Sequence, residues 1–506
     1  MKFSIVFIIL FLNSIGLFAQ GVQPAGSGTE TDPYQIANLD NLEWISLTDS
    51  SWASHFVQTA DIDASPTVNW NGGEGWSPIG YGCWGDSPFF GTYNGQGHTI
   101  DGLWVNRPNV SYQGLFGSAN GTTIANLGVT NIYINGCDQV GGLIGYANHV
   151  EITNCNSSGN VTGINYVGGL GGNNLSSYYY YNSSSVTVSG NCVVGGLCGR
   201  NVETYFYYNC TSGTVSGAIC VGGLLGGAEN TLISENYSTG NVIGNGGVGG
   251  LVGYCSRTGL DMSPVTAIDN CFSTGEVTGK NSVGGLIGSC GGNGQSNDYC
   301  YIRWSYSTGS VHGTTEVGGF LGRGNYYRVT FCFWNIETSN VSNGVDGGNH
   351  SQVFGLTTAE MQTLSTFTDV GWDFEGETAN GDNDFWRMNS LWNNGYPYLI
   401  DNCEEIGNND ETEAMPVPTV LNGNYPNPFN PTTTISFSVK HRETATLEIF
   451  NIKGQRVKSF DNFKSGNHNV IWNGTTNHGN KVGSGIFFYR LKSESGEQIR
   501  KMLMLK

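Results

Sequence analysis

The chain has 506 residues and a net charge of -19, with 77 glycines, 12% charged residues and 12% aromatic residues. This composition excludes a disordered chain and a helical protein, and it indicates an all-β fold. Residues 20–419 hold 8 Lys and Arg against 35 Asp and Glu, whereas residues 420–506 hold 12 against 5. Because an acidic body repels phosphate, the charge argues against nucleic acid as a partner.

Residues 1–19, MKFSIVFIILFLNSIGLFA, are typical of a secretory signal peptide. A lysine near the start precedes an apolar centre, and Leu17 and Ala19 occupy the positions that a signal peptidase prefers. We therefore expect cleavage between Ala19 and Gln20. No later apolar run reaches the roughly 18 to 20 residues needed to cross a bilayer, so the mature protein is expected to carry no integral membrane segment.

Residues 20–110 are predicted to form an N-terminal cap and a first irregular coil. An amphipathic stretch lies within residues 26–47. Asp61 and Asp63 are close enough in sequence to bind a cation together, but carboxylates that cap turns explain them better. His98 lies in the turn sequence NGQGHTI without a matched base or nucleophile, which favours a structural hydrogen-bonding role.

A six-residue motif recurs through residues 111–335. VGGLIG begins at residue 140, and close copies begin at residues 167, 194, 221, 248, 283 and 317. A spacing of 27 residues accommodates three short strands and three turns but not a helical pair. The segments are rich in β-branched, aromatic, Gly, Asn and Ser residues without helical periodicity. Each repeat is thus predicted to be one turn of a parallel β-helix.

The paired glycines of this motif require an explanation, because glycine weakens a strand. They are expected to let the chain adopt positive φ or a bulge and approach the neighbouring coil closely. A second signature, NCFSTGEVTG at residues 270–279 and its copies, keeps a fixed distance from the next glycine motif. The additional residues of the longest repeats therefore fall into two insertions, at residues 255–267 and 290–300.

Thirteen cysteines in an exported chain suggest oxidised pairs, and the odd number leaves at least one thiol without an intramolecular partner. Cys255 and Cys290 each follow the first valine of their glycine motif by seven residues. Coils about 4.8 Å apart would place these residues within the roughly 4.4 to 6.8 Å between Cα atoms that a disulfide spans. We predict that the two stack, either bonded or as buried free thiols.

Two aromatic runs, YYYYN at residues 178–182 and YFYYN at residues 205–209, are 27 residues apart. Most other repeats carry isoleucine at the position of Tyr179, which marks the inward face, so strand alternation turns four tyrosines outward. These are Tyr178, Tyr180, Tyr205 and Tyr207. Exposed rings with hydroxyl groups suit sugar rings. The alternative is a ladder that only stabilises the sheet, by about 0.2 to 1 kcal/mol per pair.

Residues 336–400 are predicted to form the C-terminal cap of the β-helix. Thr357 and Glu360 stand at capping-box spacing, which predicts a short helix there. Residues 401–419 are acidic, polar and proline-bearing, as in a linker. Residues 420–506 alternate strand-like runs with glycine or asparagine turns, which predicts a small Ig-like β-sandwich.

The VGGLIG and NCFSTGEVTG pair is similar to the GLUG-type repeat of bacterial surface proteins. The resemblance implies a right-handed β-helix in an adhesin-like, exported protein. NYPNPFNPTTTISF (424–437) and the closing KMLMLK resemble the type A C-terminal sorting domain of the type IX secretion system. That resemblance implies that the type IX machinery handles residues 420–506. It also implies a secreted protein, which is released or attached to the outer surface of a Gram-negative bacterium.

A β-helix can also support polysaccharide cleavage, which needs carboxylates gathered on one face. Residues 110–330 hold only ten Asp and Glu, and no two of them share a repeat position in adjacent coils. We therefore predict a non-enzymatic protein without cofactor or metal that recognises glycans or host and environmental surfaces. The alternatives are a polysaccharide lyase or hydrolase, and a purely structural surface or stalk component.

Overall fold

The structure is a computed structural model that describes residues 21–82, 87–257, 266–292, 299–346, 350–381, 383–400, 419–439, 444–463, 466–477, 479–493 and 496–505. The predicted signal peptide with its Ala19–Gln20 cleavage site lies outside the described residues, as do the linker except Thr419 and the centres of both insertions. The chain divides into two compact units at residue 403, and each is described by itself.

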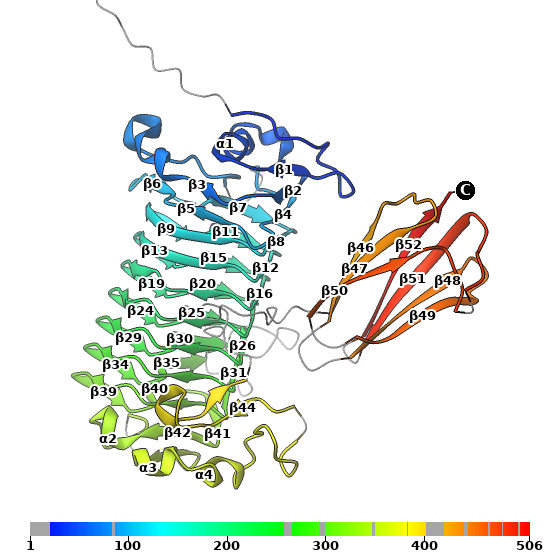
Figure 1. Cartoon of the computed structure of the whole chain (residues 1–506). Coiled ribbons are helices and arrows are strands. Elements are labelled where there is room, and N and C mark those ends of the chain that lie inside the picture. The colour runs from blue at the N-terminus through cyan, green and yellow to red at the C-terminus, as the bar shows by residue number, and fades with distance from the viewer. Residues whose placement is uncertain are drawn as a thin grey trace, which may run out of the picture. The chain divides into compact units, whose positions relative to one another are not determined.

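The first unit is a stack of coils built from parallel strands (Figure 1). Its first sheet contains β1 (Tyr34–Ile36), β2 (His55–Gln58), β4 (Thr92–Asn94), β8 (Thr123–Ala125), β12 (Glu151–Thr153), β16 (Tyr178–Tyr180), β21 (Tyr205–Tyr207), β26 (Leu232–Ser234), β31 (Ala267–Asp269), β36 (Cys300–Arg303) and β41 (Tyr327–Thr330). Its second sheet contains β10 (Asp138–Gly141), β14 (Asn165–Gly168), β19 (Cys192–Gly195), β24 (Ile219–Gly222), β29 (Gly246–Gly249), β34 (Asn281–Gly284) and β39 (Thr315–Gly318).

Two further strand sets complete each coil. The third sheet contains β7 (Phe116–Asn120), β11 (Ile144–Asn148), β15 (Gly171–Leu175), β20 (Cys198–Val202), β25 (Leu225–Glu229), β30 (Val252–Arg257), β35 (Ile287–Gly292) and β40 (Leu321–Gly324). The fourth set contains β3 (Ile62–Asp63), β5 (Thr99–Asp101), β6 (Trp104–Asn106), β9 (Gly128–Asn135), β13 (Asn156–Thr162), β17 (Ser183–Ser184), β18 (Thr187–Ser189), β22 (Cys210–Thr211), β23 (Val215–Ser216), β27 (Tyr237–Ser238), β28 (Val242–Ile243), β32 (Phe272–Ser273), β33 (Val277–Thr278), β37 (Tyr306–Ser307), β38 (Val311–His312), β42 (Cys332–Asn335) and β43 (Val353–Leu356).

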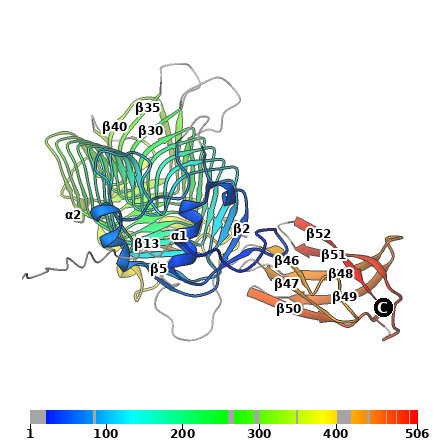
Figure 2. The same cartoon turned by 90° about the horizontal axis from the view of Figure 1, so that it is seen from above.

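Corresponding residues of successive repeats form columns along this stack. The first valines of the glycine motifs pair directly with one another, from Val140 through Val167 and Val194 to Val317. Seen along the stack, the coils lie over one another around a common interior (Figure 2). Apolar side chains from all four strand sets fill that interior. The predicted parallel β-helix is therefore confirmed.

The paired glycines allow close approach and do not adopt positive φ. A Cβ on Gly142 would lie 2.2 Å from the carbonyl oxygen of Gly169, and one on Gly196 would lie 2.0 Å from that of Gly223. None of the paired glycines has positive φ, and the strands that carry them pair without a register shift. The expectation of positive φ or a bulge is thus wrong, because steric room for the next coil is what excludes a side chain here.

The left-handed conformation lies instead at the residue before each motif valine. The residues at this position are Gln139, Tyr166, Val193, Cys220, Gly247, Ser282 and Glu316. Six of the seven are not glycine, although β-branched and bulky residues rarely adopt positive φ. The strand stacking on both sides therefore dictates this corner, whatever side chain occupies it.

Both ends of the stack are covered. At the N-terminal end, α1 (Leu39–Leu47) begins after Asn38, whose side chain accepts a hydrogen bond from the Asn41 N–H, and η1 (Asp49–Ser51) and η2 (Ser65–Gly73) follow. At the C-terminal end lie α2 (Ile336–Ser339), α3 (Thr358–Met361), α4 (Ser365–Thr368), β44 (Trp386–Arg387), η3 (Asn393–Gly395) and β45 (Tyr398–Leu399). The predicted capping box of Thr357 and Glu360 is confirmed at α3.

The C-terminal cap also covers one side of the last coils. Tyr237, Phe272, Tyr306 and Phe333 form an outward column on the fourth strand set, and their rings are buried. Trp386 of the cap packs on this column, with ring centroids 6.1 Å from Phe272 and 5.9 Å from Tyr306. The cap thus buries an aromatic face that the stack alone would expose to water.

The second unit consists of two antiparallel sheets. One contains β46 (Val420–Tyr425), β47 (Thr433–Val439) and β50 (Gly466–Trp472), and the other contains β48 (Ala445–Asn451), β49 (Arg456–Phe463), β51 (Gly485–Ser493) and β52 (Gly496–Met504). Residues of both sheets, among them Phe437, Leu447 and Tyr489, share one apolar core. This arrangement is a small β-sandwich with a core of its own.

Candidate functional site

The four tyrosines predicted to face outward lie side by side on β16 and β21. We name Tyr178, Tyr180, Tyr205 and Tyr207 the tyrosine quartet. Tyr178 pairs with Tyr205 and Tyr180 pairs with Tyr207, whereas Tyr179 between them is fully buried. The ring centroids are 4.8 Å apart in the first pair and 5.4 Å apart in the second, with nearly parallel planes.

The stacking determines which parts of the quartet reach solvent. Because each ring covers a face of its partner in the next coil, the covered faces are not available to a ligand. Tyr178 is 40% exposed and the other three are partly buried. Glu151 and Leu232 pair with the two ends of the Tyr178–Tyr205 stack. The quartet is therefore a lattice of hydroxyl groups and not an open platform of ring faces.

Three of the four phenol groups, those of Tyr180, Tyr205 and Tyr207, have raised pKa values and are neutral at physiological pH. Burial, followed by the neighbouring Tyr207 and Glu151, raises the pKa of Tyr180 to about 12. Burial is also the largest cause that raises the pKa values of Tyr205 and Tyr207. A neutral phenol both donates and accepts a hydrogen bond, so the lattice can pair with hydroxyl groups of a ligand.

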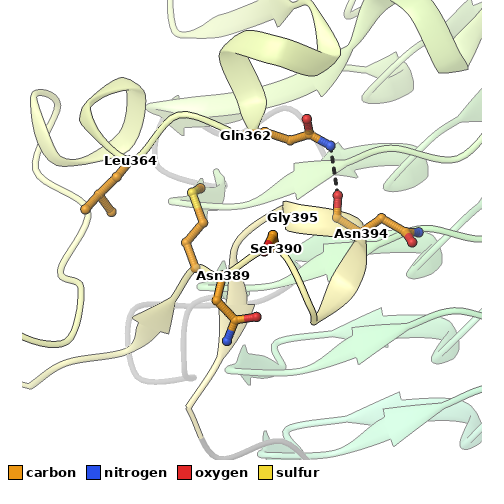
Figure 3. A pocket seen from close by; sticks show the side chains of 7 residues that line it. Gln362, Leu364, Asn389, Ser390, Asn394 and Gly395 are labelled. Atoms are coloured by element: carbon orange, nitrogen blue, oxygen red, sulfur yellow. Dashed lines mark hydrogen bonds between the residues drawn. The ribbon is translucent and has the colours of Figure 1, made fainter.

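A pocket of about 570 Å³ lies in the C-terminal cap (Figure 3). It is lined by Gln362, Leu364, Met388, Asn389, Ser390, Asn394 and Gly395. Asn389 donates to the Tyr398 hydroxyl and accepts from the Leu391 and Trp392 N–H groups, so its amide holds the cap together. No lining residue is an acid or a base, and nothing in the sequence pointed to this pocket, because the cap has no repeat to align.

The acidic candidates of the first coil hold turns. Asp61 accepts hydrogen bonds from the Thr99 N–H at 2.8 Å and from His98 Nδ1 at 3.2 Å, and these bonds lower its pKa. Asp63 accepts from the Ser65 N–H at 2.9 Å. Asp269, an acid of the later coils, forms a bidentate ion pair with Arg303. These contacts give each carboxylate a structural partner.

Cys255 on β30 and Cys290 on β35 pair in register. Both are free thiols, and they lie beside a third, Cys300 on β36, which the sequence analysis did not single out. The three sulfur atoms lie within 4.8 Å of one another, the single such group of possible metal ligands among the residues that the structure describes. Cys210, by contrast, is disulfide-bonded. The repeat pattern carried a signal for Cys300, because other coils hold threonine there.

Comparison with known proteins agrees with both units. Residues 424–505 match the family model of the secretion system C-terminal sorting domain, and residues 136–162 match the GLUG motif. This chain is a secreted protein that carries GLUG repeats and a type IX sorting domain. No helix among the described residues is long and apolar enough to cross a membrane.

Two curated proteins are similar to a part of this chain. Halomucin of Haloquadratum walsbyi is 36% identical over 148 residues, which are 29% of this chain and 2% of that protein. A putative Gly-rich membrane protein of Evansella cellulosilytica is 36% identical over 136 residues, which are 26% of this chain and 15% of that protein. The chain thus spans a small part of the length of either relative.

Proposed function

We propose that this GLUG-repeat protein is an adhesin-like binding protein that recognises glycans through the tyrosine quartet. The observation that carries the proposal is the outward pairing of four tyrosines on adjacent coils. The rigid strands hold these hydroxyl groups with little freedom to lose on binding, which favours affinity. Their regular spacing suits the hydroxyl groups that edge a polysaccharide.

A double substitution to phenylalanine separates recognition from sheet stability. Tyr180→Phe with Tyr207→Phe keeps the stacked rings and removes two hydroxyl groups. We expect glycan affinity to fall at least tenfold while the melting temperature shifts by only a few degrees. Binding of the secreted full chain to a glycan array, followed by titration calorimetry on the best ligand, measures the change.

Ile219→Ala with Ile243→Ala is the matched control, because these side chains are 53% and 50% exposed on other sheets of neighbouring coils. The control variant should bind as the parent does. Equal affinity of the phenylalanine variant and the parent would remove the quartet as the recognition surface. A chain that bound no glycan or cell surface at all would contradict the proposed function.

Two other functions remain as outcomes of the same experiments. A polysaccharide lyase or hydrolase would release new reducing ends from a glycan of the array during incubation. A structural surface or stalk component would bind no glycan and would assemble into ordered polymers. The outward pairing of the four tyrosines favours recognition over both, since neither alternative needs it.

A further inference from the structure

Three buried cysteines meet at one inward corner of the last complete coils. Cys255 and Cys290 come from the third sheet, and Cys300 comes from the first. Their exposed fractions are 0%, 3% and 0%. The corner joins β30 to β31 and β35 to β36, where the two sequence insertions leave the stack.

The preceding coils show what normally fills this corner. The column that contains Cys255 and Cys290 holds Ala147, Asn174, Asn201 and Ala228 in the earlier coils. The position of Cys300, one residue before Tyr301, corresponds to Thr231 and Thr266 in the two coils before it. Since alanine and threonine already satisfy the fold in these columns, packing alone does not require three thiols.

The sulfur positions suit coordination by one ion. Zinc–sulfur bonds are about 2.3 Å long, and a trigonal arrangement at that length places the sulfur atoms about 4.0 Å apart. The observed upper limit of 4.8 Å lies within a small side-chain adjustment of this geometry. A disulfide would join only two of the three at about 2.05 Å and would leave the third buried beside it.

A cationic side chain lies close in sequence to the corner. Arg257 lies on β30 two residues after Cys255. Three thiolates, one divalent cation and one guanidinium group sum to zero charge, which lowers the desolvation penalty of a buried site.

We propose that Cys255, Cys290 and Cys300 form a metal site that binds a thiophilic d10 ion, Zn²⁺ or Cu⁺, through three thiolates. Soft sulfur ligands select such ions over Ca²⁺ and Mg²⁺. Binding releases the three thiol protons to solvent and needs no change of oxidation state. The ion would fasten the third sheet to the first where the insertions interrupt the short connection. The site is separate from the tyrosine quartet, so either proposal can fail alone.

The test uses the full secreted chain, prepared reduced and metal-free under argon. Co²⁺ is added as an optical probe, and Zn²⁺ and Cu⁺ are then added in separate competitions. We expect one equivalent of Co²⁺ with sulfur-to-metal charge-transfer absorption, which is lost on competition. A zinc site is indicated if Zn²⁺ displaces Co²⁺ and the bound Zn²⁺ stays in place when Cu⁺ is supplied with a Cu⁺ chelator. A copper site is indicated if the protein takes Cu⁺ from that chelator.

Each substitution introduces the residue that a neighbouring coil has at the same repeat position. Cys300→Thr reproduces Thr266 and Cys255→Ala reproduces Ala228, so each should fold while metal affinity falls at least a hundredfold. Cys271→Ser is the matched control, because Cys271 is a buried thiol outside the corner whose column holds Ser305 in the next coil. The control should bind one equivalent as the parent does, and thermal unfolding of all variants checks the fold.

Three results would overturn the proposal. The first is the absence of stoichiometric binding by the parent chain with any of the three ions. The second is undiminished binding in both Cys300→Thr and Cys255→Ala. The third is a disulfide between two of the three cysteines, found by non-reducing peptide mapping of protein taken directly from the culture medium.

Discussion

Buried asparagines form a ladder inside three successive coils. Asn182, Asn209 and Asn236 are fully buried at the same repeat position. Asn209 accepts hydrogen bonds from the backbone N–H and the side-chain amide of Asn182, and it donates to Asn236 and to the Tyr179 and Tyr207 carbonyls. Each amide thus pairs the backbone of a neighbouring coil at a turn, where the strand ladders are interrupted.

Replacing the central amide should destabilise the stack strongly. Asn209→Ala removes the acceptor of the buried Asn182 N–H and the donor to the Tyr179 and Tyr207 carbonyls, so we expect the free energy of unfolding to fall by about 3 kcal/mol. Asn209→Ser is the control, because Ser305 at this position still accepts from the Cys271 N–H. The serine variant should lose about half as much. Denaturant unfolding measures both, and equal stability of all three proteins would contradict the role of the ladder.

Val193 is the β-branched residue at the left-handed corner before the motif valines, with φ of 58°. Because left-handed backbone costs an L-residue about 1 to 2 kcal/mol and asparagine tolerates it better, Val193→Asn should stabilise the stack by about 1 kcal/mol. Val193→Thr remains β-branched and should give no gain. A rise of the melting temperature in the asparagine variant alone, followed by calorimetry, checks the expectation; a fall would mean that the valine packing outweighs the strain.

The stacked columns were predictable at the residue scale, whereas the corners were not. A solenoid gives each repeat position the same environment, so Val167 above Val140 and Tyr205 above Tyr178 follow from sequence spacing alone. The left-handed corner holds glutamine, tyrosine, valine or serine, and these residues share no signal of positive φ. The glycine pair predicted both close approach and positive φ or a bulge, and only the close approach is present.

At the scale of elements, the contacts of the irregular segments were the hardest to predict from the sequence. The capping box of α3 is a local pattern and was predictable from Thr357 and Glu360. The packing of Trp386 against Phe272 joins residues more than a hundred positions apart without a repeat to align them. Cys300 lies beside Cys255 and Cys290, but the insertion before it changes the repeat length, so sequence spacing alone did not predict this contact. Contacts that do not follow the repeat spacing could be found only in the structure.

Three strands of the sandwich meet at a buried carboxylate. Glu448 on β48 lies between Arg456 on β49 and Arg490 on β51, at 2.8 Å and 2.7 Å, and it is 8% exposed. Hydrogen bonds from Arg456, followed by those from Arg490, hold the pKa of Glu448 below its usual value. The Glu448 side chain therefore links β48 to its two neighbouring strands, β49 and β51.

A carboxyl with a lowered folded pKa stabilises the fold above its unfolded pKa, and this contribution is lost as the pH falls through the folded pKa. Glu448→Gln should thus lower the stability of the sandwich by about 1 to 2 kcal/mol at pH 7, and by progressively less below about pH 4.5. Hydrogen exchange of residues 445–504 in the full chain, followed from pH 7 to pH 3, measures the difference. A difference that stayed constant or grew toward acid would contradict the assignment.

At the scale of the whole molecule, the two units have separate apolar cores and opposite charge. The core of the stack draws on residues up to Val353 and the cap on residues up to Leu399, whereas the sandwich core begins at Leu421. The stack and cap therefore bury their apolar side chains without help from the sandwich. Folding of the body and sorting by the tail are expected to be separable properties of one chain.

Deletion of residues 419–506 tests this separation. The truncated chain should retain the melting temperature of the body within a few degrees, because the core clusters of the stack and cap contain no residue of the deleted segment. It should nevertheless accumulate in the periplasm and fail to cross the outer membrane, because residues 424–505 are the matched sorting domain. Immunoblots of periplasm, membrane and medium locate the chain, with the Tyr180→Phe and Tyr207→Phe variant as a control that keeps its tail and should be secreted. Truncated protein in the medium would show that the body carries a second export signal, and unfolded protein in the periplasm would show that the two cores depend on each other.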